Sequence, residues 1–177
     1  MAATAPQVAR YLNIPPRSLN RAIELGSVRG ERISPRKFLV PVAEEVYLRS
    51  HWELLRDLRW SLRNERNIRL AVLFGSVSRG TESPDSDVDI LVGAVDSSPS
   101  RLGSFGGRLE DQLNRPVQVV ALEDASESPE LMESVLDDGR VLIDRDRRWE
   151  RLKQAAGTAR SAESEWADLI RNQSDGD

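Results

Sequence analysis

The chain has 177 residues, 39% of them hydrophobic, which is enough to bury one core and to carry a small appended module. It contains no cysteine and a single histidine, so disulfides, thiolate zinc sites and histidine-rich metal centres are excluded. Any metal would therefore have oxygen ligands. No secretory pattern opens the sequence and no run is apolar enough to span a membrane, so we expect a cytoplasmic protein.

Residues 1–40 predict a small module of two helices and a hairpin. A first helix over residues 5–12 is broken by "NIPP", and "PRSLNRAIEL" forms a second helix that stops at Gly26. The following "SVRGERISPRKFLV" has the size and the β-prone residues of a hairpin or wing. Residues 1–70 carry 13 Arg or Lys against seven Asp or Glu, which favours a polyanionic partner, although an uneven solvated surface would carry the same charges.

The second predicted helix could bring polar side chains to DNA. Its first turns carry residues able to reach phosphates or base edges, namely Arg17, Ser18, Asn20 and Arg21. Basic residues of the hairpin would contact backbone phosphates, namely Arg29, Arg32, Arg36 and Lys37. The segment "VARYLNIPPRSLNRAIELGSVRGERI" resembles the helix-turn-helix of excisionase-like and MerR-like winged DNA-binding domains, which implies such a domain over residues 1–40. The alternative is a helical cap that binds protein instead of DNA.

The rest of the chain predicts an α/β domain with a mixed sheet flanked by helices. Residues 41–67 have apolar residues at helical spacing and no internal Gly or Pro, which predicts a linking helix. The apolar runs "IRLAVLF", "DVDILVG" and "PVQVVAL" predict buried strands, with a helix between the last two. A further helix and a short strand complete the domain, residues 68–147. Residues 148–177 predict a final helix and a frayed tail, with Trp149, Trp166 and Leu169 among its apolar positions.

The stretch "LFGSVSRGTESPDSDVDILV" joins the first two of these strands and carries the candidate chemistry. Gly75 allows the backbone to approach a ligand closely, and free N–H groups beside the Ser76 hydroxyl favour phosphate oxygens. Asp87 and Asp89 are two residues apart on a strand, so they project from the same face and could share a divalent cation. Together they predict a Mg²⁺ site for nucleotidyl or phosphoryl transfer.

Simpler interpretations exist for each part of this stretch. Gly75-Ser76 alone could be a plain turn, and the aspartates could be polar residues at a strand edge. The run from Asp85 to Asp89 begins like a calcium loop, but Ile90 stands where such loops need glycine. The phosphate-binding loop is also not of the Walker type, because the Gly-Lys-Ser/Thr ending is missing.

As a unit, "GSVSRGTESPDSDVDILV" resembles the G-S-x10-D-x-D signature of the minimal nucleotidyltransferases of the DNA polymerase β-like superfamily, some of which are antitoxins. The likeness extends over about residues 68–145. It implies that Asp87 and Asp89 ligate Mg²⁺ and that a nucleoside triphosphate, with ATP preferred, is bound by Gly75, Ser76, Arg79 and Ser86.

One position departs from that family. Active members usually carry a third acid on the third strand, where this chain has Gln118. An amide can ligate or hydrogen-bond, but it cannot accept a proton at neutral pH. We therefore expect weakened catalysis, by about 10² to 10³, unless Glu123 or Asp124 substitutes.

Three functions follow from these observations. The first is a nucleotidyltransferase that transfers a nucleoside monophosphate, AMP by preference, to a partner such as a cognate toxin, and represses its own operon through operator DNA. The second is a catalytically weak or inactive regulator that acts by binding its partner. The third is a transferase acting on a small molecule such as an antibiotic. A homodimer is compatible with all three.

Overall fold

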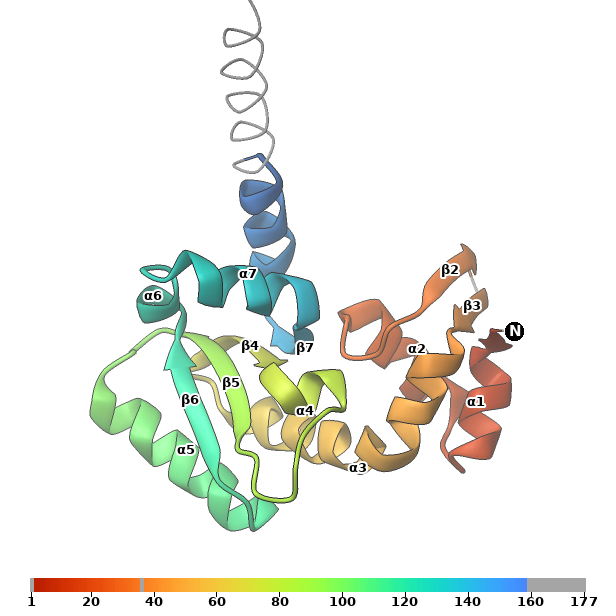
Figure 1. Cartoon of the computed structure of the whole chain (residues 1–177), viewed down its shortest axis with the longest axis horizontal. Coiled ribbons are helices and arrows are strands. Elements are labelled where there is room, and N and C mark those ends of the chain that lie inside the picture. Colours follow the sequence, from red (N-terminus) through yellow and green to blue (C-terminus); the bar gives the residue numbers. More distant parts are fainter. Residues whose placement is uncertain (1, 36, 159–177) are drawn as a thin grey trace, which may run out of the picture. The chain divides into compact units, whose positions relative to one another are not determined.

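The computed structural model describes residues 2–35 and 37–158 (Figure 1). The chain divides into two compact units, at the boundary between Arg145 and Asp146. In the second unit residues 148–158 are helical, and the predicted apolar positions Trp166 and Leu169 lie outside the described residues. Among the described residues, no helix is long and apolar enough to cross a bilayer.

The N-terminal part consists of two helices and a three-stranded antiparallel sheet. The helices are α1 (Ala5–Tyr11) and α2 (Pro16–Leu25), as the sequence predicts. Gly26 ends α2 with a φ of 92°, a left-handed conformation that glycine adopts without strain. The strands are β1 (Ala3–Thr4), β2 (Glu31–Ser34) and β3 (Lys37–Val40), in the order β1-β3-β2. The predicted hairpin is therefore confirmed as β2 and β3.

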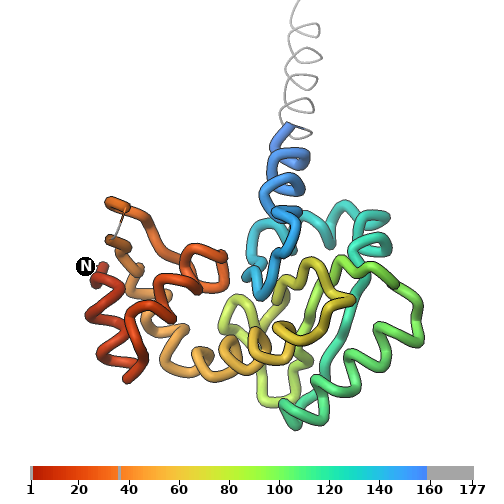
Figure 2. The backbone as a smooth tube through the Cα atoms, turned by 180° about the vertical axis from the view of Figure 1, so that it is seen from behind, coloured from red at the N-terminus to blue at the C-terminus, as the bar shows by residue number. Residues whose placement is uncertain are grey.

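The predicted linking helix is confirmed as α3 (Val42–Asn64). Figures 1 and 2 both show it running from the N-terminal helices to the second sheet. Its apolar side is fully buried through Leu48, Leu55, Leu58 and Leu62. Buried residues from α1 to the last strand of this unit form one continuous hydrophobic cluster with α3.

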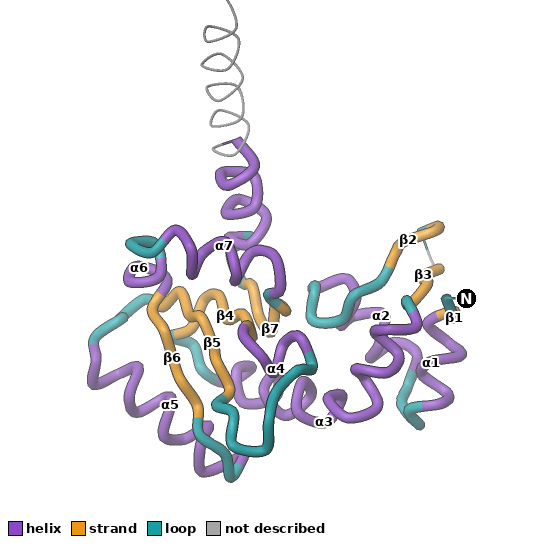
Figure 3. The backbone as a smooth tube through the Cα atoms, in the orientation of Figure 1, coloured by secondary structure: helices purple, strands orange, loops and turns teal. Residues whose placement is uncertain are grey.

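The second sheet is mixed, as predicted, with the strand order β6-β5-β4-β7 (Figure 3). Its strands are β4 (Ile68–Phe74), β5 (Val88–Ala94), β6 (Val117–Ala121) and β7 (Arg140–Asp144). β4 pairs antiparallel with β5 and β7, whereas β5 and β6 are parallel and joined by a helical crossover. The helices around the sheet are α4 (Gly75–Arg79), α5 (Pro99–Leu113), α6 (Leu122–Ala125) and α7 (Pro129–Asp138).

The two faces of this sheet have different neighbours. Ala71, Leu73 and Ile90 belong to the main cluster together with buried residues of α3 and α5. Side chains alternate along a strand, so Val72 and Leu91, which are buried but outside that cluster, project from the other face. The polar residues at the start of β5 share this second face.

Candidate functional site

The turn after β4 brings Gly75 against Asp89. Phe74 is paired with Asp89 across the two antiparallel strands, and Gly75 follows with a φ of +74°. A Cβ at Gly75 would lie 2.2 Å from Asp89 Oδ2, a separation that no side chain can occupy. The glycine therefore lies directly against one member of the aspartate pair.

We expect a Gly75→Ala substitution to lower both stability and nucleotide binding. The left-handed backbone alone costs about 1–2 kcal/mol for a residue with a Cβ, and the contact with Asp89 forces a shift at the site itself. Gly103→Ala is the matched control, because Gly103 lies inside α5 with nothing within 4 Å of the added Cβ. That change should stabilise by about 0.5–1 kcal/mol. Thermal unfolding with and without a non-hydrolysable triphosphate measures both effects, and equal behaviour of the two variants would contradict the prediction.

Asp89 and Gln118 occupy the same face at the start of two parallel strands, and Asp87 directly precedes the first of these strands instead of lying on it, as was expected from the sequence. Asp89 is paired in register with Gln118, whereas Val88 and Val117 point into the main cluster. Asp87 and Gln118 are exposed and Asp89 is half-buried. Burial raises the pKa of Asp89, the charge of Asp87 raises it further, and Arg79 lowers it. The two carboxylates thus repel each other within reach of one guanidinium group, an arrangement that a bound cation would stabilise.

Among the described residues, no third acid joins this pair. Within the part of the chain that the structure describes, no cluster of three or more His, Cys, Asp or Glu side chains could hold a metal ion. Substitution by Glu123 is wrong, because β6 ends at Ala121 and Glu123 begins the next helix at the opposite end of the strands from Gln118. There the Glu123 carboxylate accepts a hydrogen bond from Ser97 Oγ at 3.2 Å. Asp124 lies on the same short helix.

The remaining predicted nucleotide-binding residues differ in the contacts that they make within the protein. Arg79 is exposed and its guanidinium lies 3.1 Å from Asp138 Oδ2, an ion pair at the surface. Ser86 Oγ accepts a hydrogen bond from the backbone N–H of Ser83 at 2.9 Å, so its hydroxyl closes the loop before β5. Ser76 is half-buried beside Gly75, and its carbonyl accepts the Thr81 N–H.

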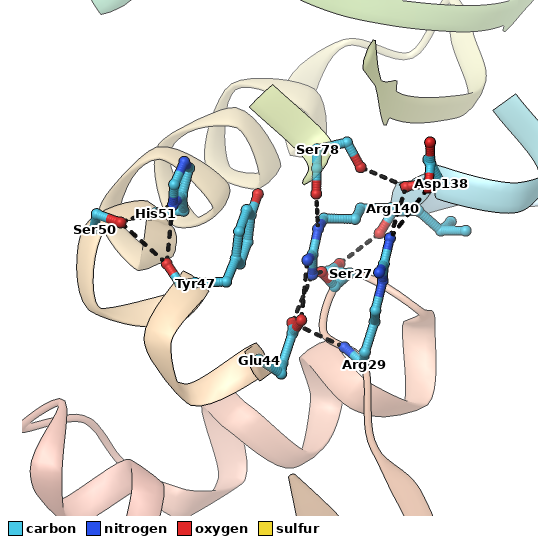
Figure 4. A network of polar contacts seen from close by, with 10 residues as sticks. Ser27, Arg29, Glu44, Tyr47, Ser50, His51, Ser78, Asp138 and Arg140 are labelled. Atoms are coloured by element: carbon cyan, nitrogen blue, oxygen red, sulfur yellow. Dashed lines mark hydrogen bonds and ion pairs between the residues drawn. The ribbon is translucent and has the colours of Figure 1, made fainter. Parts of the chain in front are cut away.

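A buried ion pair connects α4 to its neighbouring elements (Figure 4). Arg140 is 2% exposed, pairs with the equally buried Glu44 through two contacts of 2.5 and 2.9 Å, and donates from Nε to the Ser78 carbonyl at 2.8 Å. Its guanidinium also lies 3.6 Å from the ring centroid of Tyr47. Ser78 Oγ in turn donates to the Asp138 carbonyl. The α4 helix, which begins at Gly75, is thereby fixed to α3, α7 and β7. The sequence did not predict this arrangement.

His51 is a packing residue and not a free base. It is buried, its ring stacks on that of Tyr47 with centroids 4.0 Å apart, and its Nε2 lies 2.6 Å from Glu82 Oε1. Glu82 belongs to the loop between α4 and β5, so this contact holds the loop that precedes the aspartates. Burial raises the pKa of Tyr47.

The residues predicted to contact DNA differ in their exposure and in the contacts that they already make. Arg17, Arg21 and Lys37 are exposed, and Arg36 lies outside the described residues. Arg32 is engaged by Glu24 at 3.0 Å and Arg29 by Asp138 at 3.9 Å, both in surface ion pairs. Ser18 is half-buried, and the carboxamide oxygen of Asn20 is buried with no hydrogen-bond partner among the described residues.

A mixed sheet whose first two strands meet at a Gly-Ser turn and an aspartate pair defines a nucleotidyltransferase fold. The sequence profile described as polymerase beta, nucleotidyltransferase matches residues 57–148, just over half of the chain, and the chain belongs to this family. No curated protein sequence matches it.

Two solved structures carry the same fold, and a third is less similar. One is a crystal structure of a toxin–antitoxin with AMP-PNP, 25% identical, with a TM-score of 0.51 over 67% of this chain and 96% of that one. Another is a mutant of the MntA–HpeT toxin–antitoxin, 24% identical, with a TM-score of 0.50 over 70% and 97%. A third, from Shewanella oneidensis, is 21% identical with a TM-score of 0.44 over 70% and 96%.

Proposed function

We propose that the chain is a Mg²⁺-dependent nucleotidyltransferase that transfers AMP from ATP to a hydroxyl group of a protein partner, as the antitoxin of a toxin–antitoxin pair. The observation that supports it most is the contact of Gly75 with Asp89. A phosphate group that approaches the backbone at Gly75 would lie beside the aspartate pair. The likeness to a toxin–antitoxin solved with AMP-PNP supports the adenine nucleotide and the kind of partner.

The donor set fits magnesium. Asp89 on β5 and Asp87 just before it offer hard oxygen ligands, and burial together with the charge of Asp87 raises the pKa of Asp89, so a divalent cation would stabilise its ionised form. When bound, Mg²⁺ would neutralise charge on the triphosphate and on the transferring phosphoryl group. The backbone at Gly75 and the Ser76 hydroxyl would bind phosphate oxygens, and Arg79 would exchange its surface pairing with Asp138 for the phosphates.

Gln118 determines how fast this chain can transfer. It lies beside Asp89 in register, where its amide oxygen can accept a hydrogen bond from the acceptor hydroxyl but cannot take its proton. This position supports a second candidate function, in which the protein binds nucleotide and partner without efficient transfer. The small-molecule transferase is less attractive, because an N-terminal DNA-binding module would have no evident role in it.

Restoring the acid tests the two candidates. Radiolabelled ATP, with label on the α-phosphate, is incubated with the full chain, Mg²⁺ and the protein that copurifies with it. A slow transferase should label that partner, and Gln118→Asp should raise the rate by about 10² to 10³. Gln112→Asp is the matched control, because Gln112 is an exposed residue of α5, outside the site. If neither wild type nor Gln118→Asp labels any protein, the transferase proposal is wrong and the binding function remains.

We further propose that residues 1–40 bind operator DNA as a winged helix-turn-helix domain. Two helices followed by a hairpin, with exposed Arg17 and Arg21 at the start of the second helix, support it. In a mobility-shift assay with the DNA upstream of its own gene, the Arg17→Ala/Arg21→Ala variant should lose binding, and wild-type affinity should fall steeply with salt. Binding that does not depend on salt or on these arginines would favour the protein-binding cap.

A further inference from the structure

A cavity lies between α2 and α3, away from the aspartate pair. Its volume is about 780 Å³, and β7 contributes to its wall. Cavities of roughly 300–1,000 Å³ accommodate ligands of drug size, which includes a nucleotide unit. The side chains that give it chemical character are four arginines and two tryptophans: Arg21, Arg56, Arg59, Arg63, Trp52 and Trp60.

Three of these arginines form an uncompensated positive cluster. Arg56 is paired with Asp57 at 2.9 Å, and the one acidic residue in the lining, Glu24, is paired with Arg32. Arg21, Arg59 and Arg63 have no carboxylate partner among the described residues. Burial lowers the pKa of Arg59, and the charges of Arg21 and Arg63 lower it further, so Arg59 is repelled by both neighbours. An anionic group between them would remove this repulsion.

The tryptophans add a stacking surface to the cluster. Trp60 is 62% exposed at the cavity, and the Arg63 guanidinium lies 6.0 Å from its ring centroid. Trp52 is buried and forms part of the wall. A solvent-exposed indole beside guanidinium groups is suited to a flat ring joined to phosphates. Bases in a duplex are stacked on each other, so only an unpaired base can reach such a ring.

We propose that this cavity binds single-stranded nucleic acid, with phosphates between Arg21, Arg59 and Arg63 and an unpaired base stacked on Trp60. The site is distinct from the transfer site. It shares Arg21 with the residues proposed to contact operator DNA, whereas Arg59, Arg63 and Trp60 belong to this site alone. It would give the protein a second nucleic-acid ligand, such as a transcript or a melted DNA segment.

Fluorescence anisotropy with the full chain tests the proposal, without ATP or Mg²⁺ so that the outcome is independent of nucleotide transfer. The probes are fluorescein-labelled single strands of about ten nucleotides, in RNA and DNA form, and the duplex of the same sequence. Single strands should bind more tightly than the duplex, and affinity should fall with salt. Trp60→Ala should weaken single-strand binding by about fivefold to 100-fold, the range for one stacked base. The RNA and DNA probes identify which strand is preferred.

Arg59→Gln separates binding from folding. Removing a half-buried charge that its neighbours repel should leave the unfolding temperature unchanged or raise it, while single-strand affinity falls about tenfold. Arg101→Gln is the control, because Arg101 is an exposed arginine of α5; it should change neither quantity.

Three outcomes would overturn the proposal. Equal binding of duplex and single strand, unchanged in Trp60→Ala, would assign the arginines to a duplex surface. Full competition by free AMP at the affinity of the strand would assign the cavity to mononucleotides. Failure of every oligonucleotide to bind, with capture of an acidic amphipathic peptide instead, would assign it to a protein partner.

Discussion

We expect Asp89→Asn to reduce nucleotide transfer by a factor of about 10² or more without destabilising the protein. Transfer falls because the variant loses one of the two carboxylates that would hold Mg²⁺. Stability does not fall, because Asp89 is half-buried beside the charge of Asp87 and its ionised form is disfavoured in the folded chain. A variant that is inactive and yet equally or more stable would separate a functional role from a structural one.

The pH dependence of this stability follows from the direction of the pKa shift. A carboxyl group whose pKa is raised in the folded state favours folding at low pH and loses that contribution as the pH rises through the folded pKa. The unfolding temperature of Asp89→Asn relative to wild type should therefore increase from acid pH towards pH 7. Asp85→Asn, an exposed carboxylate in the preceding loop, should change neither transfer nor this profile.

Nucleotide binding gives the same experiment a second readout. Wild type should show a Mg²⁺-dependent rise in unfolding temperature with AMP-PNP, and Asp89→Asn should lose the Mg²⁺-dependent part. An undiminished Mg²⁺-dependent rise in the variant would contradict the assignment of Asp89 as a metal ligand, whatever the transfer rate.

We expect Arg140→Met to lower the free energy of unfolding by about 3–5 kcal/mol, because it leaves Glu44 buried without its partner. The substitution also removes the donor to the Ser78 carbonyl, so α4 loses a contact that fixes it. Urea unfolding measures the loss. The double variant Glu44→Leu/Arg140→Met removes both charges and should recover most of the stability.

Arg101→Met is the control for this pair. Arg101 lies 3.6 Å from Asp96 with both side chains more than half exposed, so its loss should cost less than about 1 kcal/mol. If the double variant is as unstable as Arg140→Met alone, the buried charge of Glu44 is not the cause, and the hydrogen bonds to Ser27 and Ser78 would account for the loss.

Local patterns were sufficient to predict most of the fold. The long helix, the strands and the stop at Gly26 each depend on residues close in sequence, and all are present. The proximity of Gly75 to Asp89 follows from the antiparallel pairing of β4 and β5, which brings the end of the first strand beside the start of the second.

Features that depend on distant residues could not be predicted in this way. Glu44 and Arg140 are 96 residues apart, and nothing in either local segment indicates that they meet. The arginine-lined cavity likewise depends on the packing of α2 against α3, which neither segment indicates by itself. Glu123 lies beyond the end of β6, as expected, and the helix that begins at Leu122 keeps it away from Gln118.

The shared hydrophobic cluster around α3 couples the N-terminal part of the chain to the second sheet. A module attached by a flexible tether can be exchanged or deleted at little cost, whereas here Ala5, Leu48 and Leu142 belong to the same hydrophobic interior. Removing the first 40 residues would strip apolar cover from the neighbouring fold. Residues 1–40 and the neighbouring sheet should therefore unfold together, as one cooperative unit.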